Sequence, residues 1–422
     1  MTSNTIAPNP WMILPFVLLL GAIALAPLLA RDWWARHYPK IALGVGAVTL
    51  AYYLFVLRAP DRVLEVAHDY VCFIVLIGSL FVVSGGIHIR VKGEATPPVN
   101  VVFLFIGAVL ANVLGTTGAS MLLIRPWIRM NKYRVTAHHV VFFIFVVANV
   151  GGCLTPIGDP PLFLGYLQGI PFWWVAKQCW PMWLTGVGLL LAMFYIVDRR
   201  NFARAPREIR GMETAHETWQ FDGLPNLFFL AVILGAVFVR KPVFLREGIM
   251  AAAALGSYFT TARGVHEANR FHFHPLQEVA ILFIGIFATM IPALDWLELN
   301  ARSLLGAHPA PGVFLFGTGL LSSVLDNAPT YLSFLSALFG TSGAKEIGEL
   351  IRGETLNLAA ISIGAVFLGA ATYIGNGPNF MVKAIADHEK VHTPTFPGFV
   401  LKFTLPFLMP VLLAVWWIFF RV

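Results

Sequence analysis

Two short motifs interrupt apolar stretches that are otherwise long enough to cross a lipid bilayer, and each motif carries a carboxylate. Residues 154–161 read LTPIGDPP, and residues 325–330 read LDNAPT. Inside a membrane, unwound backbone is tolerated only where it is buried in protein or lines a cavity, and a charged side chain there is costly. Asp159 and Asp326 are therefore predicted to belong to a functional site within a membrane protein.

The composition agrees with a membrane protein. Hydrophobic residues make up 58% of the chain and charged residues 12%, whereas soluble domains carry about 25% charged residues. The 422 residues have room for roughly ten spans of about 20 residues. The net charge of +7 does not indicate nucleic acid, because the Lys and Arg residues lie in short loops between apolar runs. The three cysteines lie in apolar runs, and their odd number argues against a disulfide framework.

Hydropathy predicts an all-α polytopic protein with about ten transmembrane helices and two re-entrant hairpins. The predicted parts are N-terminal scaffold helices (1–69), a first repeat (70–197), a basic cytoplasmic loop (198–223), linking scaffold helices (224–276) and a second repeat (277–422). Each repeat is expected to hold one hairpin (about 99–130 and about 309–340) and one broken helix (about 137–170 and about 355–387).

The second half of the chain repeats the first. Three pairs of segments align in the same order, at offsets of 211, 217 and 207 residues: 110–118 with 321–329, 155–161 with 372–378, and 76–78 with 283–285. Two of these pairs fall at the interruptions. Internal repeats with interrupted helices are typical of secondary transporters, so we expect two inverted structural repeats.

The distribution of basic residues predicts an orientation. With the N-terminus outside, the loops assigned to the cytoplasm hold 19 of the 29 Lys and Arg residues, as the positive-inside tendency requires. The two hairpins then open to opposite faces of the membrane. The expected location is a bacterial inner membrane, with the lipid bilayer as the surrounding medium.

The interruptions supply the oxygen ligands that Na⁺ and other hard cations prefer. The candidate set is Thr116, Thr117, Ser120, Thr155, Asp159, Asp326, Asn327, Thr330, Thr372, Asn376 and Asn379. Burial favours a protonated carboxyl group, and a bound cation favours the carboxylate, so Asp159 and Asp326 could each exchange a proton for Na⁺. Each Asp could also cap a half-helix, and capping is compatible with ion binding.

Two histidine pairs are weaker candidates. His272 and His274 form a His-x-His pair that could bind metal, but a loop role is favoured because no further ligand lies nearby in the sequence. His138 and His139 open the first broken helix on the cytoplasmic side, where they could sense pH, although anchoring at the headgroup level is favoured. Motifs for ATP binding and for the common hydrolases were not found in the sequence.

These motifs resemble the ion transporter superfamily, which includes NhaD-type sodium/proton antiporters, arsenite permeases, citrate–metal symporters and divalent-anion/sodium symporters. Residues 149–161, NVGGCLTPIGDPP, resemble the Asn-x-Gly-Gly…Ile-Gly-Asp segment of the NhaD and arsenite-permease branch, and LDNAPT resembles its Asp-Asn-x-Pro hairpin tip. The likeness runs from Val71 to Val422. It implies scaffold and transport domains, a homodimer and elevator-type motion.

Two departures from that pattern bear on the substrate. The first hairpin tip is the neutral Gly115-Thr116-Thr117-Gly118, where the NhaD branch usually has an acidic residue, and neutral tips are typical of the divalent-anion branch. The second broken helix reads IGNGPN at residues 374–379, an unusual variant. The chain therefore has fewer site carboxylates than a typical antiporter.

The leading hypothesis is a secondary transporter that exchanges Na⁺ or Li⁺ for H⁺ without another cofactor, with Asp159 and Asp326 carrying charge. On this hypothesis Asp326→Asn is expected to abolish exchange. The first alternative is a cation-coupled importer of citrate or another small carboxylate. The second is an intramembrane enzyme with an Asp159–Asp326 acid/base pair, which would need the two carboxyl groups in contact. Nucleic acid is not expected as a partner.

Overall fold

The computed structural model describes residues 7–91, 95–204, 220–239 and 241–421. These residues form helices almost throughout, and the prediction of an all-α polytopic membrane protein is confirmed. Seven helices in the described part are long and apolar enough to cross a bilayer, or eight if the bent pair 347–353 and 355–369 counts as one span. Shorter apolar helices lie at Ala137–Gly152, Asn226–Ala236 and Pro311–Val324.

One group of helices, which we call the scaffold group, combines the predicted N-terminal and linking segments with the helices at residues 60–85 and 274–305, which the sequence analysis assigned mainly to the two repeats. It comprises η1 (Pro10–Ile13), α1 (Leu14–Leu29), α2 (Arg31–Ala51), the π-helix η2 (Tyr52–Val56), α3 (Pro60–Gly85), α9 (Asn226–Ala236), α10 (Leu245–Thr260), α11 (Arg263–Ala268) and α12 (His274–Leu305). Helices α2 and α12 cross closely, because a Cβ added to Gly285 would lie 2.7 Å from the carbonyl oxygen of Ala42. Small residues at a crossing permit this approach, on which packing between membrane helices depends.

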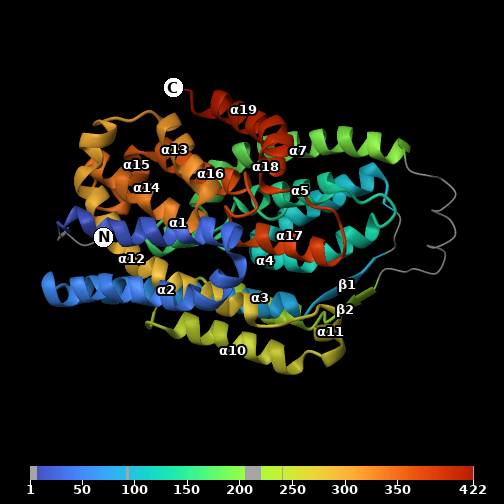
Figure 1. Cartoon of the computed structure of the whole chain (residues 1–422), viewed down its shortest axis with the longest axis horizontal. Coiled ribbons are helices and arrows are strands. Elements are labelled where there is room, and N and C mark those ends of the chain that lie inside the picture. Colours follow the sequence, from blue (N-terminus) through green and yellow to red (C-terminus); the bar gives the residue numbers. More distant parts are fainter. Residues whose placement is uncertain (1–6, 92–94, 205–219, 240, 422) are drawn as a thin grey trace.

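The remaining helices contain both interrupted regions. They are α4 (Pro97–Met130), α5 (Ala137–Val146), η3 (Val150–Gly152), α6 (Pro160–Leu167), α7 (Trp174–Arg204), α13 (Pro311–Val324), α14 (Asn327–Ser342), α15 (Ile347–Gly353), α16 (Thr355–Gly369), α17 (Gly377–His388), α18 (Phe396–Phe399), the π-helix η4 (Val400–Leu408) and α19 (Met409–Phe419). In Figure 1, α2, α3 and α10 lie in the lower half, and α7, α13, α16 and α19 lie in the upper half.

Helix α4 is a hairpin and not one long span. Gly115 has φ 74° and ψ 156°, a conformation that glycine adopts without a steric penalty, and the chain turns back there. As a result the two ends of α4 meet: the Asn100 side-chain amide donates to Asn131 Oδ1 at 2.8 Å, and the rings of Phe103 and Trp127 stack with centroids 5.5 Å apart. The first predicted hairpin is therefore present.

Helices α13 and α14 form the second hairpin. Only Leu325 and Asp326 separate them, and a Cβ added to Gly317 on α13 would lie 2.9 Å from the Phe334 ring on α14. In Figure 1 the open end of this hairpin, beside α15, lies toward the left, near the N-terminus. The open end of α4 lies near the C-terminal end of α7, because Asn100 also bonds Asp198. The two hairpins thus enter from opposite ends of the molecule.

The two broken helices make an equivalent contact with the two hairpins. Residues 147–159 separate α5 from α6, and residues 370–376 separate α16 from α17. In the first break, Thr155 Oγ1 donates to the backbone oxygen of Asn112 on the first hairpin at 2.6 Å. In the second break, Thr372 Oγ1 donates to the backbone oxygen of Ser323 on the second hairpin, also at 2.6 Å. These residues are equivalent at the two sequence offsets of 217 and 211.

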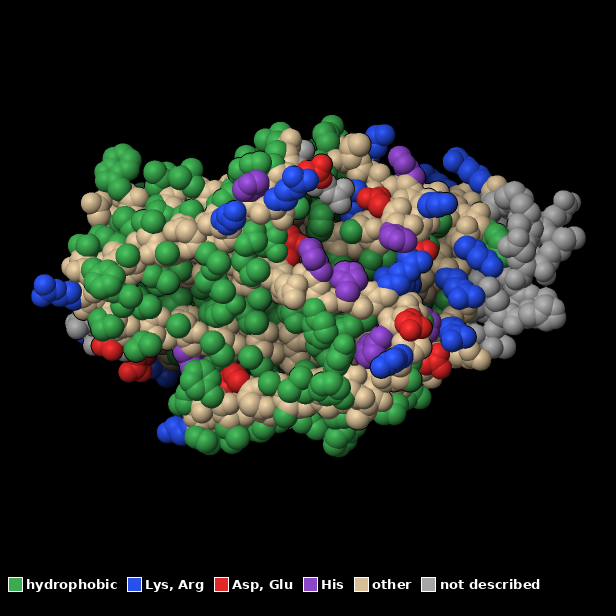
Figure 2. All heavy atoms as spheres, turned by 60° about the horizontal axis from the view of Figure 1, so that its bottom comes forward, with side chains coloured by type: hydrophobic (Ala, Val, Ile, Leu, Met, Phe, Trp, Pro, Cys, Tyr) green, Lys and Arg blue, Asp and Glu red, His purple; other side chains and the backbone are tan. Residues whose placement is uncertain are grey.

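The structure departs from the sequence prediction around the basic loop. Helix α7 continues to Arg204, so residues 198–204 are helical, and residues 205–219 lie outside the described residues. Residues 220–222 form strand β2 (Gln220–Asp222), which pairs antiparallel with β1 (His88–Arg90). Three-residue strands have no recognisable period in the sequence. Figure 2 shows Lys, Arg and His side chains gathered toward the end of the molecule where this ribbon lies.

Candidate functional site

Asp159 lies where the two broken helices and both hairpin tips meet. Its side chain is fully buried. Oδ1 accepts hydrogen bonds from Thr116 Oγ1 at 2.8 Å and from the Asn376 amide at 3.1 Å, and Oδ2 accepts one from the Asn327 amide at 2.6 Å. All three donors are neutral, and each comes from a different interruption. We call Asp159, Thr116, Asn327 and Asn376 the central cluster.

The central cluster follows the internal repeat. Thr116 and Asn327 are equivalent at the offset of 211 residues and occupy the two hairpin tips. Asp159 and Asn376 are equivalent at the offset of 217 and precede helices α6 and α17. A carboxylate on one side of the pseudo-twofold relation therefore faces an amide on the other. The cluster has two halves of similar shape and a single formal negative charge among its members.

Asn149, which the site prediction omitted, links the two breaks. Its Oδ1 accepts a hydrogen bond from the Asn376 amide at 3.0 Å, and its own amide donates to Asn379 Oδ1 at 2.6 Å and to the backbone oxygen of Ile144 at 2.8 Å. Asn149 thus orients the Asn376 amide toward Asp159. The signal was present in the Asn-x-Gly-Gly segment, but a lone asparagine at a helix end gives no indication of a partner 227 residues away.

Asp326 has a different role in the structure. Its carboxylate caps α14, since Oδ1 accepts a hydrogen bond from the backbone N–H of Ala328 at 3.0 Å. Asp159 also occupies a helix N-cap position, but its side chain makes no capping bond. The two carboxylates therefore differ: Asp326 satisfies the end of a half-helix, and Asp159 faces the other repeat. Their bonds go to different partners, unlike those of an acid/base pair.

The other predicted ligands lie around the cluster. Thr155 and Thr372 brace the breaks against the hairpins, as described above. Thr330 Oγ1 donates to the backbone oxygen of Asp326 at 2.9 Å. The Asn379 amide donates to the backbone oxygens of Gly369 and Thr372, and so holds the second break in shape. Ser120 is buried on the second arm of the first hairpin, and Thr117 is partly buried at its tip.

Glycines let the backbone approach the cluster closely. A Cβ on Gly158 would lie 2.0 Å from the backbone oxygen of Gly152, and a Cβ on Gly375 would lie 2.8 Å from that of Gly369. These two contacts are again equivalent at the offset of 217. A Cβ on Gly369 would be 3.3 Å from Asn149 Oδ1 and 3.4 Å from the Asn327 amide nitrogen. Any larger residue at Gly369 would therefore press on two polar groups of the site.

A small cavity adjoins the cluster between the scaffold helix α3 and the first hairpin tip. Its lining includes Leu76 and Leu80 of α3 and Thr116 and Thr117 of the tip. Its volume of about 20 Å³ accommodates one water molecule. The combination of one buried carboxylate, neutral amides and hydroxyls suits a small cation, because amide and hydroxyl groups can present oxygen to it.

The fold is that of an integral, multi-pass membrane protein, and the central cluster joins segments that are equivalent in the two halves of the sequence. The chain belongs to the family described as "Putative citrate transport", which matches residues 5–420. The chain is also similar to the 46 kDa membrane protein of Mycobacterium leprae (strain TN). The two are 25% identical over 312 residues, which cover 70% of this chain and 71% of the relative.

Proposed function

We propose that the protein is a secondary active transporter in which Asp159 binds Na⁺ or Li⁺ in exchange for H⁺. The observation that carries this proposal is the central cluster: a fully buried carboxylate whose bonded partners are two amides and one hydroxyl. A single negative charge in this setting balances one monovalent cation or one proton, and it cannot remain buried and unbalanced without cost. Competition between the two ions for Asp159 then couples their movements.

The geometry favours Asp159 over Asp326 as the carrier of charge. Asp326 is committed to capping α14, whereas Asp159 is bonded only to groups that can rearrange, namely amides that rotate and a hydroxyl. Alternating access requires the hairpin tips to close over a bound ion from opposite sides. Thr116 and Asn327, one from each tip, already contact the same carboxylate. Elevator-type movement of the hairpin-containing group against α3 and α12 is the motion we infer, in a homodimer.

A second candidate is cation-coupled uptake of citrate or a related carboxylate. The family to which the chain belongs favours it, as does the neutral tip of the first hairpin. In this scheme the Asp159 cluster holds the coupling cation, and the anion binds beside it near Thr117, where the cavity adjoins α3. Both schemes therefore assign the cation to Asp159.

Proton flux in proteoliposomes with a fixed pH gradient tests the proposal. If Na⁺ or Li⁺ alone dissipates the gradient in wild type but not in Asp159→Asn, the exchange is supported. If only citrate produces flux, and Asp159→Asn abolishes citrate uptake, the second scheme replaces it. Ion-driven flux that persists in a correctly folded Asp159→Asn protein would refute both.

A further inference from the structure

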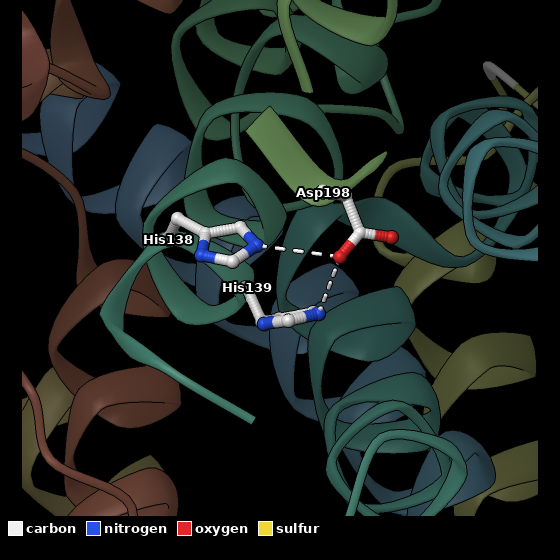
Figure 3. A group of neighbouring side chains, drawn as sticks. All are labelled: His138, His139 and Asp198. Atoms are coloured by element: carbon white, nitrogen blue, oxygen red, sulfur yellow. Dashed lines mark hydrogen bonds and ion pairs between the residues drawn. The ribbon is translucent and has the colours of Figure 1, made fainter. Parts of the chain in front are cut away.

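A buried group of charged and titratable side chains lies at the open end of the first hairpin, far along the chain from the central cluster. Asp198 of α7 is fully buried, and the nearest nitrogens of His138 and His139 lie 3.4 Å and 3.1 Å from its Oδ1. Arg134 forms an ion pair with both oxygens of Asp198. Figure 3 shows both imidazole rings directed at the carboxylate. We call Arg134, His138, His139 and Asp198 the root cluster.

The root cluster holds three elements together. Asn100, on the first arm of α4, donates to Asp198 Oδ2 at 2.9 Å, and Asn131 follows the second arm and bonds Asn100. Arg134 also donates to the backbone oxygen of Ala95 at 2.9 Å. Asp198 therefore joins both arms of the first hairpin to α5 and α7. This hairpin also carries Thr116 at its tip, where Thr116 contacts Asp159.

The second repeat lacks this arrangement. At the offset of 217 residues, the positions of His138, His139 and Asp198 are taken by Thr355, Leu356 and Val415. The fold thus does not require two histidines facing an aspartate at a hairpin root. This combination gives the end that we assign to the cytoplasm a property that the equivalent positions of the second repeat do not share.

The two histidines are held differently. His139 Nδ1 accepts a hydrogen bond from the backbone N–H of Thr136 as part of a capping box at the start of α5, and its Nε2 faces Asp198. A second proton on its ring would oppose that backbone N–H. His138 Nδ1 instead faces the Thr136 hydroxyl at 2.6 Å. A hydroxyl can donate or accept, so His138 can gain a proton without losing this bond.

We propose that His138 is a proton sensor that controls how tightly the root of the first hairpin is held. Among the described residues, the charged and titratable groups around it are Asp198 from α7, Arg134 from the loop before α5, and its neighbour His139. The first hairpin contributes the neutral Asn100, and the neutral Asn131 follows its second arm. When both imidazoles are neutral, the positive charge of Arg134 balances the negative charge of Asp198. A proton on His138 adds a positive charge that competes with Arg134 for Asp198, and the root loosens as the pH falls.

The cluster is better suited to a proton than to a metal ion. Arg134 Nη1 contacts Asp198 Oδ1 and lies 3.4 Å from His139 Nε2. A positively charged group thus already occupies the place between these ligands that a metal ion would take.

Thiol labelling tests the sensor without any transport. Ala95 is buried in a small apolar group with Val91 and Met130, and its backbone oxygen accepts the hydrogen bond from Arg134. In an Ala95→Cys protein in detergent, maleimide labelling is measured at about pH 8 and about pH 5.5, on either side of imidazole titration. The buried Cys72, Cys153 and Cys179 provide the wild-type background. We expect labelling, corrected for the pH dependence of a free thiol, to be about tenfold faster at the lower pH, as an unbalanced buried charge implies.

The matched variants decide the outcome. Adding His138→Gln keeps a donor toward Asp198 and should remove the pH effect, and His138→Asn provides the same test if the Gln variant does not fold. Adding His272→Gln, which changes an exposed histidine, should leave the effect intact. The proposal is overturned if the labelling rate rises at low pH as much with His138→Gln as without it. It is also overturned if the labelling rate rises in none of the proteins. The labelling result does not rest on the proposed function, so failure of ion exchange would leave it interpretable.

Discussion

Exchanging the two central residues provides a strict test of the site. Asp159 and Asn376 are equivalent in the two repeats and lie in contact, with Oδ1 and Nδ2 3.1 Å apart. The single change Asp159→Asn removes the charge, the single change Asn376→Asp adds a second one beside it, and the double exchange restores one carboxylate to the same centre. The partners Thr116 and Asn327 are themselves equivalent, so the exchanged carboxylate meets a similar set of donors.

The expected magnitudes follow from electrostatics. A unit charge about 4 Å from a bound cation contributes about 4 kcal/mol at an effective dielectric constant near 20. The neutral oxygen of an asparagine recovers about 1 kcal/mol of this through its own dipole. The net loss of about 3 kcal/mol corresponds to roughly a hundredfold weaker binding for Asp159→Asn. In the double exchange the charge moves by only the width of one contact, so we expect affinity to return to within about tenfold of wild type.

The assay is the Na⁺ or Li⁺ concentration that gives half-maximal proton flux in proteoliposomes, for wild type, both single variants and the double exchange. Melting temperature and gel filtration provide the folding control. If the double exchange is as poor as Asp159→Asn while both proteins remain folded, the position of the carboxylate and not the charge of the centre controls transport. That result would refute the pseudo-symmetric description of the site.

Substitutions at four further positions test separate parts of the structure. Asp326→Asn should retain ion affinity to within about threefold in the flux assay, because asparagine caps a helix as well as aspartate does. Asp326→Ala should lower the unfolding free energy by about 1 kcal/mol, as measured by thermal melts. The sequence alone led us to expect that Asp326→Asn would abolish exchange. The structure changes this expectation because the Asp326 carboxylate caps α14. Asn149→Ala removes the link between the two breaks and leaves buried amide groups without partners. We therefore expect the unfolding free energy to fall by about 1–3 kcal/mol and ion binding to weaken. Unchanged ion affinity would show that the orientation of the Asn376 amide is unimportant. Gly158→Ala should prevent correct folding, because the added Cβ would overlap a backbone oxygen. Gly377→Ala is the control: its added Cβ would have no neighbouring atom within 4 Å, so the variant should express and melt like wild type. Expression level and monodispersity distinguish the two variants.

The interruptions could be predicted because their causes are local. Gly115 takes a positive φ that favours glycine, and Pro160 stands at the start of α6, where proline is tolerated, so both residues mark their interruptions in the sequence. The repeat could also be predicted from the order of its matching segments. The roles of Asp159 and Asp326 could not be separated in this way. Both precede a half-helix, and the difference lies in side-chain direction, which depends on the opposite repeat.

The root cluster was missed for a related reason. His138 and His139 were noticed, but their partner Asp198 stands 60 residues from His138 and was assigned to a loop, because the polar end of α7 reads like one. The pairing becomes visible only when α7 packs beside α5. Helix ends that extend beyond the apolar core are where hydropathy gives the least information about structure.

The contact between Asp159 and Asn376 bears on how such a protein could have arisen. If one ancestral half paired with an inverted copy of itself, any residue at this position would have faced its own duplicate across the axis. Two aspartates at this separation could not both remain ionised, and two asparagines would offer no charge to an ion. Once the halves were joined in a single gene, the positions could diverge to one acid and one amide. In a symmetric pair of aspartates the single charge would depend on a proton shared between the two carboxyl groups. Fusion of the halves would thus have made a single carboxylate with a neutral partner accessible to selection, without that shared proton.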